Sequence, residues 1–459
     1  MRLFSKASAF SAVLLFGALH ADAQSPGAPG PSVQQTVAKI DEYMEAAVRV
    51  NGFSGSILVA RDGQPIAGKG YGMANYELDV PNSPQTVFRL GSLTKPFTAT
   101  AIMMLQERGK LKTGDSICAH LSECPAAWQA VTIHHLLTHT SGIPDYTALP
   151  ENDKTRALPV SHVELVARFK DKPLEFAPGQ AFKTSNSGYY LLGIIIERAA
   201  AMSYEDFLQA NLFKPLGMTS TGYDRNSRVI KNRASGYGVL AGILVNAPYT
   251  DMSSPFAAGG LYSTVEDLLR WDRALYTDTL VSRQSVEKIF TPFKSEHGYG
   301  WYNRTKHGRR ALEQNGSLGG FFSAFTRVPD ERVTVIVLAN TARANTRAIA
   351  DDLSAIALDA PYKVPQERKA ITLDAKILDK YVGEYQLASG VAVTFTIENG
   401  QLTRQVGTQP KVALIAVSET EFFVPGIEQR IAFLTDAQGR VIAYVSRRGA
   451  AELRATKIK

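Results

Sequence analysis

The 459-residue sequence predicts an α+β fold that is followed by a separate antiparallel β domain. Three observations predict this arrangement. Residues 55–60 form an apolar, β-type run that enters a tight turn at residues 61–63. Residues 99–106 form an apolar stretch of helical character. From Leu378 onward the chain shows only short alternating strands, and no long helical pattern occurs after residue 382.

The other elements follow in order from apolar spacing and turn residues. The main domain is predicted to begin with a helix from near Thr36, followed by a return strand through 70–72 and a segment at 86–90 that leads into Gly91. Helical patterns broken by Pro and Gly are predicted over 118–230. A helix from Val265 and strands at 298–301 and 332–338 complete the predicted domain. The β domain is predicted to contain a clear strand at 391–397 and turns at 399–400 and 438–439.

Composition places the boundaries between these parts. Residues 24–36 are rich in Pro, Gly, Ser and Gln, which predicts a flexible lead-in. The main domain is predicted over 37–360 and the β domain over 374–459, with a proline-containing linker at 361–373 between them. Apolar residues make up 45% of the chain and charged residues 20%, which is typical of a globular protein with ample cores.

The first 23 residues have the pattern of a secretory signal peptide. A basic start precedes an apolar run over residues 7–19, and residues 21–23 read Ala-Asp-Ala, which fits an A-x-A cleavage site. The run is shorter than the ~20 apolar residues that a membrane span needs. We therefore predict cleavage after Ala23, a periplasmic or secreted mature protein, and no transmembrane segment.

The formal net charge of +7 raises the question whether the protein binds an anionic partner such as nucleic acid or the cell envelope. The basic excess is diffuse, and no Lys/Arg run with interleaved aromatic residues occurs, so a nucleic-acid partner is not predicted. A solvated basic surface explains the excess most simply. Contact with an anionic cell envelope is the alternative.

Cys118 and Cys124 are the only cysteines of the chain. In an exported protein, two cysteines this close in sequence predict one local disulfide. A zinc site would need further ligands, and none accompanies the pair. Because the closed loop is short, the bond should pin a turn rather than hold the fold together.

A Ser-x-x-Lys tetrad, from Ser92 to Lys95, is the main candidate for catalytic chemistry. A serine hydroxyl becomes a nucleophile when its proton is removed, and a lysine one helical turn away can remove it. Pro96 is tolerated only near the start of a helix, so a helix should begin close to Ser92 and end at Gly109. A helix N-terminus favours the negative charge that develops in acyl transfer.

Spacing alone does not identify this tetrad, because Ser285 and Lys288 have the same spacing. Glu287 stands beside Lys288 in an amphipathic surface stretch. We therefore predict that this second tetrad is an exposed helical turn without a catalytic role.

Two further segments accompany Ser92 and Lys95. They are Thr184-Ser185-Asn186 and Gln314-Asn315-Gly316-Ser317, and supporting stretches lie at 88–92, 136–144 and 257–261. Together the segments resemble the beta-lactamase/penicillin-binding-protein serine hydrolases, in the branch of class C beta-lactamases, D-amino-acid peptidases and esterases. The resemblance covers roughly residues 37–360.

The resemblance implies an antiparallel sheet flanked by helices, a mostly helical subdomain and a site in the cleft between them. The C-terminal module resembles the small, barrel-like β domains that are often appended to such enzymes. The implied reaction is hydrolysis through an acyl-enzyme on Ser92, with a small-molecule or peptide substrate and without a cofactor or metal. The resemblance implies that Lys95 accepts the serine proton, that Thr184 relays a proton, and that Asn186 anchors Lys95 and the substrate amide. The backbone N–H groups of Ser92 and Ser317 would form the oxyanion hole. The implied walls of the substrate pocket are Gln314, Asn315, Gly316 and Tyr146.

Two positions depart from the family pattern. Thr184 stands where tyrosine is usual, and it keeps a hydroxyl, as in the Ser-x-Asn of penicillin-binding proteins. Gln314 stands where lysine, histidine or tryptophan is usual. A lost charge-assisted hydrogen bond costs roughly 1.5–3 kcal/mol. We therefore expect weak recognition of a substrate carboxylate and weak beta-lactam hydrolysis, with short esters or uncharged amide termini as better substrates.

Other functions remain open at this level. The two departures also fit a catalytically degenerate relative that binds peptides or peptidoglycan fragments. His135 and His139 are four residues apart, but the glutamate of a metallohydrolase helix is missing. The sequence contains no G-x-S-x-G elbow, no P-loop and no dinucleotide fingerprint. The fold alone does not choose among beta-lactams, D-amino-acid peptides and short esters.

Overall fold

The computed structural model describes residues 32–459, except 241, 344, 368, 428 and 449–450. The predicted signal peptide and residues 24–31 of the predicted lead-in lie outside the described residues. Across the described part of the chain, no helix combines the length and the apolar character that a bilayer crossing requires.

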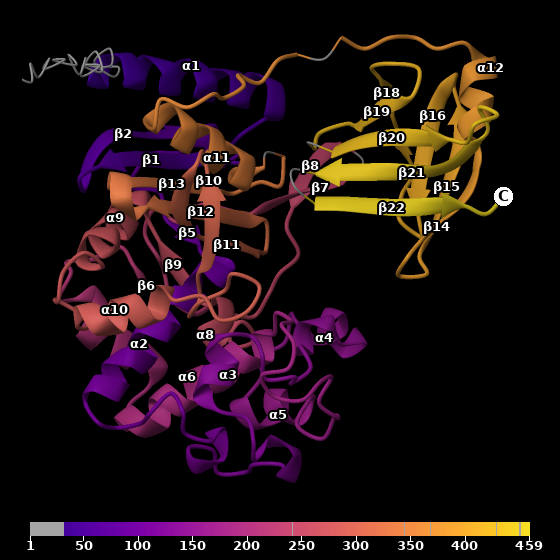
Figure 1. Cartoon of the computed structure of the whole chain (residues 1–459). Helices are drawn as coiled ribbons and strands as arrows, with labels where there is room; N and C mark the ends of the chain where they lie inside the picture. The colour runs from indigo at the N-terminus through magenta and orange to yellow at the C-terminus, as the bar shows by residue number, and fades with distance from the viewer. Residues whose placement is uncertain (1–31, 241, 344, 368, 428, 449–450) are drawn as a thin grey trace, which may run out of the picture.

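A six-stranded antiparallel sheet forms the centre of the main domain (Figure 1). Its strands, in spatial order, are β10 (Tyr302–Lys306), β11 (Arg309–Leu318), β12 (Phe321–Val328), β13 (Val333–Ala339), β1 (Gly55–Arg61) and β2 (Gln64–Tyr71). Every residue of β13 is buried. Because alternate side chains of a strand point to opposite faces, β13 contributes to two separate cores.

One face of the sheet is covered by α1 (Val33–Asn51) and α11 (Thr346–Ala357). Ile57 and Val335 point into this core, together with Ile40 of α1. The opposite face is covered by α9 (Val265–Ala274) and α10 (Arg283–Phe290), which share a second core with α2 (Lys95–Glu107). This second core is continuous with the helical part of the domain, so the sheet and the helices form one packed body.

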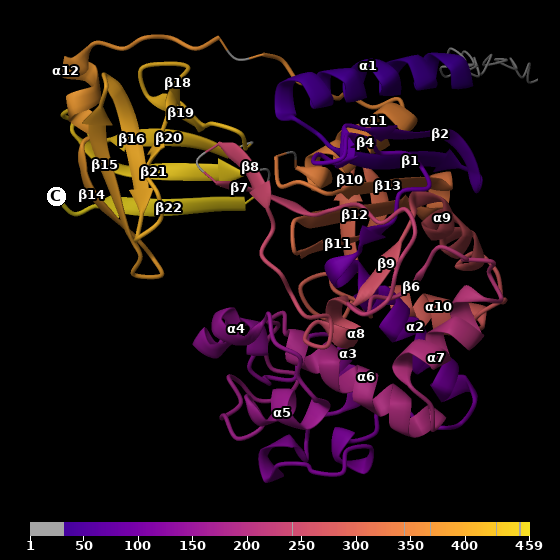
Figure 2. The ribbon, with the colours of Figure 1, turned by 180° about the vertical axis from the view of Figure 1, so that it is seen from behind.

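A mostly helical subdomain lies beyond one end of the sheet, as Figures 1 and 2 show. Its helices are α3 (Ile133–Leu137), α4 (Pro150–Thr155), α5 (His162–Ala167), α6 (Asn186–Ala200), α7 (Tyr204–Leu208) and α8 (Phe256–Gly259). Helix α6 is at its centre and contacts α2, α3, α7 and α8. The predicted disulfide between Cys118 and Cys124 is confirmed.

Among the described residues, seven short strands lie outside the six-stranded sheet of the main domain. They are β3 (Met73–Asn75), β4 (Val80–Pro81), β5 (Phe88–Arg89), β6 (Gly222–Tyr223), β7 (Tyr237–Leu240), β8 (Ile243–Asn246) and β9 (Leu261–Ser263). Strands β5, β9 and β6 form a small sheet next to the start of α2. The hairpin of β7 and β8 reaches toward the C-terminal domain, where Gly242 lies close to Pro425 and Gly426.

The C-terminal part is a nine-stranded antiparallel sheet that nearly closes into a barrel, which confirms the predicted architecture. In spatial order its strands are β17 (Val412–Ala413), β16 (Gln401–Val406), β15 (Ala392–Glu398), β14 (Gly383–Leu387), β22 (Ala451–Lys457), β21 (Val441–Arg448), β20 (Gln429–Thr435), β19 (Glu421–Val424) and β18 (Ile415–Ala416). The edge strands β17 and β18 are joined through Leu414 alone, so the two edges must lie close together. Helix α12 (Ala375–Leu378) precedes this sheet.

Two local predictions were wrong. Helix α1 begins at Val33 rather than near Thr36, because Ser32 and Gln35 form a capping box that starts the helix earlier. The stretch 298–301 is a loop rather than a strand. A Cβ atom on Gly300 would lie 2.9 Å from the Pro96 backbone nitrogen, so this loop presses its backbone against the first turn of α2.

Candidate active site

Ser92 lies at the entry to α2. The chain leaves β5, forms a short 3-10 helix over Gly91–Thr94, and continues directly into α2 with Pro96 in its first turn. The helix ends at Glu107, and Gly109 follows in the left-handed region at φ 68°. Both predicted helix limits are therefore confirmed, and Ser92 stands where backbone N–H groups lack partners within the helix.

The Lys95 ammonium nitrogen lies at the centre of a hydrogen-bond cluster. Nζ lies 2.8 Å from Ser92 Oγ, 2.9 Å from Asn186 Oδ1 and 3.1 Å from the Ala258 carbonyl oxygen. Lys95 is only 5% exposed. Burial lowers its pKa to about 8, although the negative charge of Asp145 acts in the opposite direction. A lysine with this pKa is neutral in a larger fraction of molecules near physiological pH than a lysine with the ordinary pKa of 10.5.

Asn186 connects Lys95 to a carboxylate. It is the first residue of α6, and its Nδ2 donates to Asp145 Oδ2 at 3.1 Å and to Thr147 Oγ1 at 3.0 Å. Its backbone N–H donates to Asp145 Oδ1 at 3.2 Å. With the amide nitrogen directed to Asp145 and Thr147, the amide oxygen must face Lys95. The described site is thus a chain from Ser92 through Lys95 and Asn186 to Asp145.

The segment 314–317 approaches Ser92 through its backbone. It lies on β11, and a Cβ atom on Gly316 would lie 2.0 Å from the Leu90 carbonyl oxygen and 2.8 Å from the Ser92 nitrogen. A Cβ atom on Gly91 would lie 2.7 Å from the Ser317 nitrogen. Two backbones this close require glycine at the contact. The backbone nitrogens of Ser92 and Ser317 are therefore held near each other.

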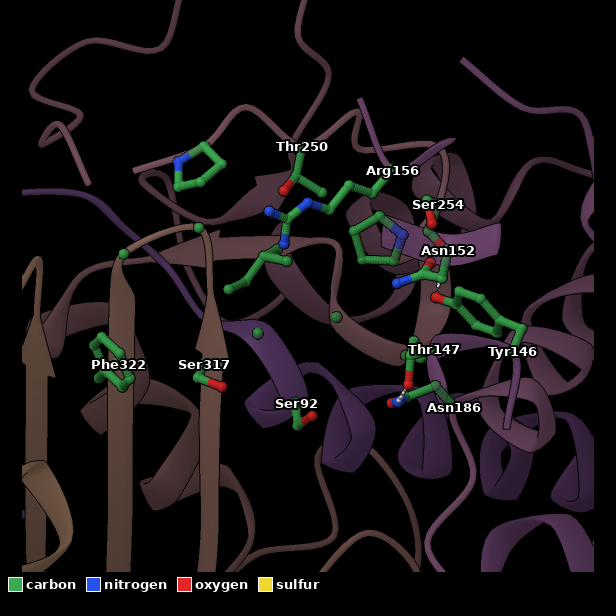
Figure 3. A pocket seen from close by; sticks show the side chains of 18 residues that line it. Ser92, Tyr146, Thr147, Asn152, Arg156, Asn186, Thr250, Ser254, Ser317 and Phe322 are labelled. Atoms are coloured by element: carbon green, nitrogen blue, oxygen red, sulfur yellow. Dashed lines mark hydrogen bonds between the residues drawn. The ribbon is translucent and has the colours of Figure 1, made fainter. Parts of the chain in front are cut away.

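A cavity of about 500 Å³ opens over Ser92 (Figure 3). Of the predicted site residues, Ser92, Asn186, Ser317 and Tyr146 line it. Tyr146 OH donates to the Ser254 carbonyl oxygen at 2.7 Å, and burial raises its pKa, so this phenol does not replace the missing tyrosine base at position 184.

The structure does not bring the other predicted residues into this cavity. Thr184 is exposed just before α6, and its side chain has no hydrogen-bond partner among the described residues. The buried Gln314 donates from Nε2 to the Gly300 carbonyl oxygen at 2.8 Å and accepts from the Asn315 backbone. Gln314, Asn315 and Gly316 lie beside the cavity without lining it.

Thr147, Asn152 and Arg156 are among the lining residues that the sequence analysis missed. They come from the short helix at 146–148 and from the region of α4. Thr147 directly follows Tyr146, which was a predicted pocket residue, so its position offered some signal. The positions of Asn152 and Arg156 in the sequence offered no such signal, because polar residues on a short helix usually face solvent.

Two buried histidines lie behind Lys95. The rings of His139 and His297 are 4.9 Å apart, and the positive charge of Lys95 acts on both. Burial lowers the pKa of His139 well below its usual value and that of His297 to about 3, so both rings are neutral. His139 Nδ1 accepts from the Ser185 backbone N–H at 3.2 Å and thereby holds the segment before α6. No group of three or more metal-ligating side chains occurs among the described residues.

The second Ser-x-x-Lys tetrad has different partners. Ser285 is buried on α10 rather than exposed, because its hydroxyl donates to Glu107 at the end of α2. Lys288 Nζ donates to Thr113 Oγ1 at 2.7 Å. Since serine and lysine here bind different neighbours, this tetrad lacks the amine–hydroxyl contact that Lys95 and Ser92 make.

Comparisons with known proteins agree with this fold. The family model for beta-lactamase matches residues 37–359, and a domain of unknown function, DUF3471, matches residues 367–452. Penicillin-binding protein 4* of Bacillus subtilis (strain 168) is 33% identical over 422 residues, which cover 85% of this chain and 93% of that protein.

Solved structures show the same relationship. An octameric penicillin-binding protein homologue from Pyrococcus abyssi is 26% identical with a TM-score of 0.65, and the match covers 92% of this chain and all of that one. A penicillin-binding protein from Bacillus halodurans is 28% identical with a TM-score of 0.62, covering 69% of this chain and 98% of that one.

The fold and these matches define a hydrolase of the penicillin-binding-protein class. The chain belongs to the beta-lactamase family.

Proposed function

We propose that this protein is a serine hydrolase that cleaves esters or amides through an acyl-enzyme on Ser92. The observation that carries the proposal is the buried amine of Lys95, which has a pKa of about 8 and lies 2.8 Å from the Ser92 hydroxyl oxygen. A neutral amine at this distance can accept the hydroxyl proton. The proposed substrates are short esters and D-amino-acid or peptidoglycan-type peptides, and export would place the enzyme in the periplasm or outside the cell.

The reaction proceeds in two stages. Lys95 accepts the proton of Ser92 as Oγ bonds to the acyl carbon, and the backbone N–H groups of Ser92 and Ser317 bind the oxyanion. Each such donor contributes about 3 kcal/mol in the transition state. The Lys95 ammonium then protonates the leaving group as its bond to the acyl carbon breaks. Water attacks the acyl-enzyme by the same route, with Lys95 taking the water proton and returning one to Ser92 Oγ.

The role of Thr184 as a proton relay stays a prediction. The hydroxyl of Thr147 is the other candidate for a functional hydroxyl at this site. Thr147 Oγ1 accepts from Asn186 and donates to Asp145 Oδ2 at 2.8 Å, so it positions the amide that contacts Lys95. We expect Thr147→Val to lower kcat/KM about 10-fold, the effect of one lost hydrogen bond, and Thr147→Ser to restore it. We expect Thr184→Val to change kcat/KM less than about 3-fold. A larger loss at Thr184 would support the relay through that residue.

A non-catalytic binding protein is the second candidate, because Thr184 and Gln314 depart from the family pattern. A covalent probe separates the two functions. Incubation with a fluorophosphonate or a penicillin, followed by intact mass and peptide mapping, is expected to show one adduct on Ser92.

Ser285→Ala provides the matched control, since it removes the serine of the second tetrad. It should keep the adduct, and Ser92→Ala should lose it. A folded protein that forms no adduct with either reagent and hydrolyses no ester or amide in a panel would favour the binding protein.

A further inference from the structure

A single charged side chain lines the cavity over Ser92. Of its 18 lining residues, Arg156 alone carries a formal charge, and the rest are neutral polar, apolar or glycine residues. Figure 3 shows the Arg156 side chain extending across the cavity beside Thr250, toward the strand that carries Ser317. The cation therefore faces the same space as the Ser92 hydroxyl.

The backbone of Arg156 is held on both sides. Its N–H donates to the Asn152 carbonyl oxygen at 2.9 Å, and its carbonyl oxygen accepts from the Asp251 N–H at 2.8 Å. The guanidinium has no hydrogen bond or ion pair with any described residue. A half-buried guanidinium with five unused donors is suited to bind an oxyanion with two oxygens.

The nearby carboxylates are already engaged elsewhere. Asp145 accepts from Asn186 and Thr147, and Asp251 accepts from Ser253 and Asn226. Neither forms an ion pair with Arg156 in the described structure. The positive charge of Arg156 is therefore not neutralised within the cavity, and a ligand of complementary charge would be an anion.

We propose that Arg156 binds a free carboxylate of the substrate, so that the preferred substrates are esters or amides that carry such a group. This inference rests on the proposed function and names its substrate class. It changes the expectation drawn from Gln314. The neutral Gln314 side chain bonds to Gly300 outside the cavity, and the cation is supplied by a different element, the end of α4.

The test compares esters that differ only in charge. One pair is p-nitrophenyl glutarate, which has a free carboxylate, and its methyl ester. A second pair is an acyl-D-alanyl-D-alanine with a free terminus and its carboxamide, which places the carboxylate on the leaving group. We expect kcat/KM to be about 10- to 100-fold higher for the acid in at least one pair, as for other charge-assisted hydrogen bonds. The pair that shows the preference identifies the side of the scissile bond that Arg156 faces.

The Arg156→Gln variant should lower kcat/KM for the acid more than for its neutral partner, and so remove the preference. Lys154→Gln is the matched control, because it removes the same charge from the exposed side of α4. It should keep the preference. Arg156→Lys should keep part of it, since lysine retains the charge without the planar fork.

The outcomes separate the two proposals. If the parent hydrolyses neither member of any pair, the proposed function fails. If it hydrolyses the pairs without a preference for the acid, or if Arg156→Gln slows both members equally, the carboxylate assignment is overturned while the hydrolase assignment stands.

Discussion

Lys95→Met is expected to lower kcat/KM for any ester substrate by at least about 1,000-fold, because it removes the proposed proton acceptor of Ser92. Methionine is of similar length, so the buried position can remain filled. The Lys95 amine is the only side-chain base that contacts Ser92 Oγ in the described structure. Steady-state kinetics with p-nitrophenyl acetate measures the loss, and thermal unfolding verifies that the variant folds.

The same amine should set the pH dependence. The acceptor must be neutral, so kcat/KM should rise with pH and level off above about 8, the value to which burial lowers the pKa of Lys95. Residual activity of Lys95→Met should not show this rise. Lys288→Met, in the second tetrad, should leave both the rate and the pH profile unchanged. A Lys95→Met enzyme with near-parent activity would remove the basis of the mechanism.

Gly316→Ala is expected to destabilise the protein by about 3 kcal/mol or more, which is large for a single methyl group. The added Cβ would lie 2.0 Å from the Leu90 carbonyl oxygen. Its neighbours are backbone atoms, which cannot rotate away as a flexible side chain can. Separation of β11 from the segment that carries Ser92 would also move apart the backbone nitrogens of Ser92 and Ser317, which form the proposed oxyanion hole, so activity should fall even where the variant remains folded.

Urea denaturation measures this effect, with Gly68→Ala as the control. Gly68 lies on β2 of the same sheet, and a Cβ atom there would meet no atom within 4 Å. The control should stay within about 1 kcal/mol of the parent. Equal stability of Gly316→Ala and the parent would show that the two backbones are farther apart than described.

The contact between Ser92 and Lys95 could be predicted because it is local. Two residues three apart at a helix start must lie on one side of the first turn, and Pro96 indicates where that turn begins. The same spacing at Ser285 and Lys288 shows the limit of this logic, because there the serine bonds to Glu107 and the lysine bonds to Thr113. Local spacing allows a contact, and the surroundings determine whether it forms.

The placement of Thr184 and Gln314 could not be predicted from local spacing. Thr184 precedes an N-cap residue with extended backbone, Ser185, and its side chain is left in solvent while the next residues turn into the site. Gln314 is drawn to a carbonyl oxygen of the loop at 298–301, which was predicted to be a strand. Resemblance to a family aligns positions, but it does not determine which way each side chain points.

The sequence by itself determined the class of fold, the contact between Ser92 and Lys95, and the disulfide, because each depends on residues near one another in the chain or on an ordered set of motifs. Only the tertiary structure decided the electrostatics of the cavity. Asp145, Thr147 and Arg156 reach the site from a stretch far in sequence from both Ser92 and Ser317. Whether a distant polar side chain faces solvent or a shared cavity depends on how helices pack against the sheet, and that packing is a property of the folded chain as a whole.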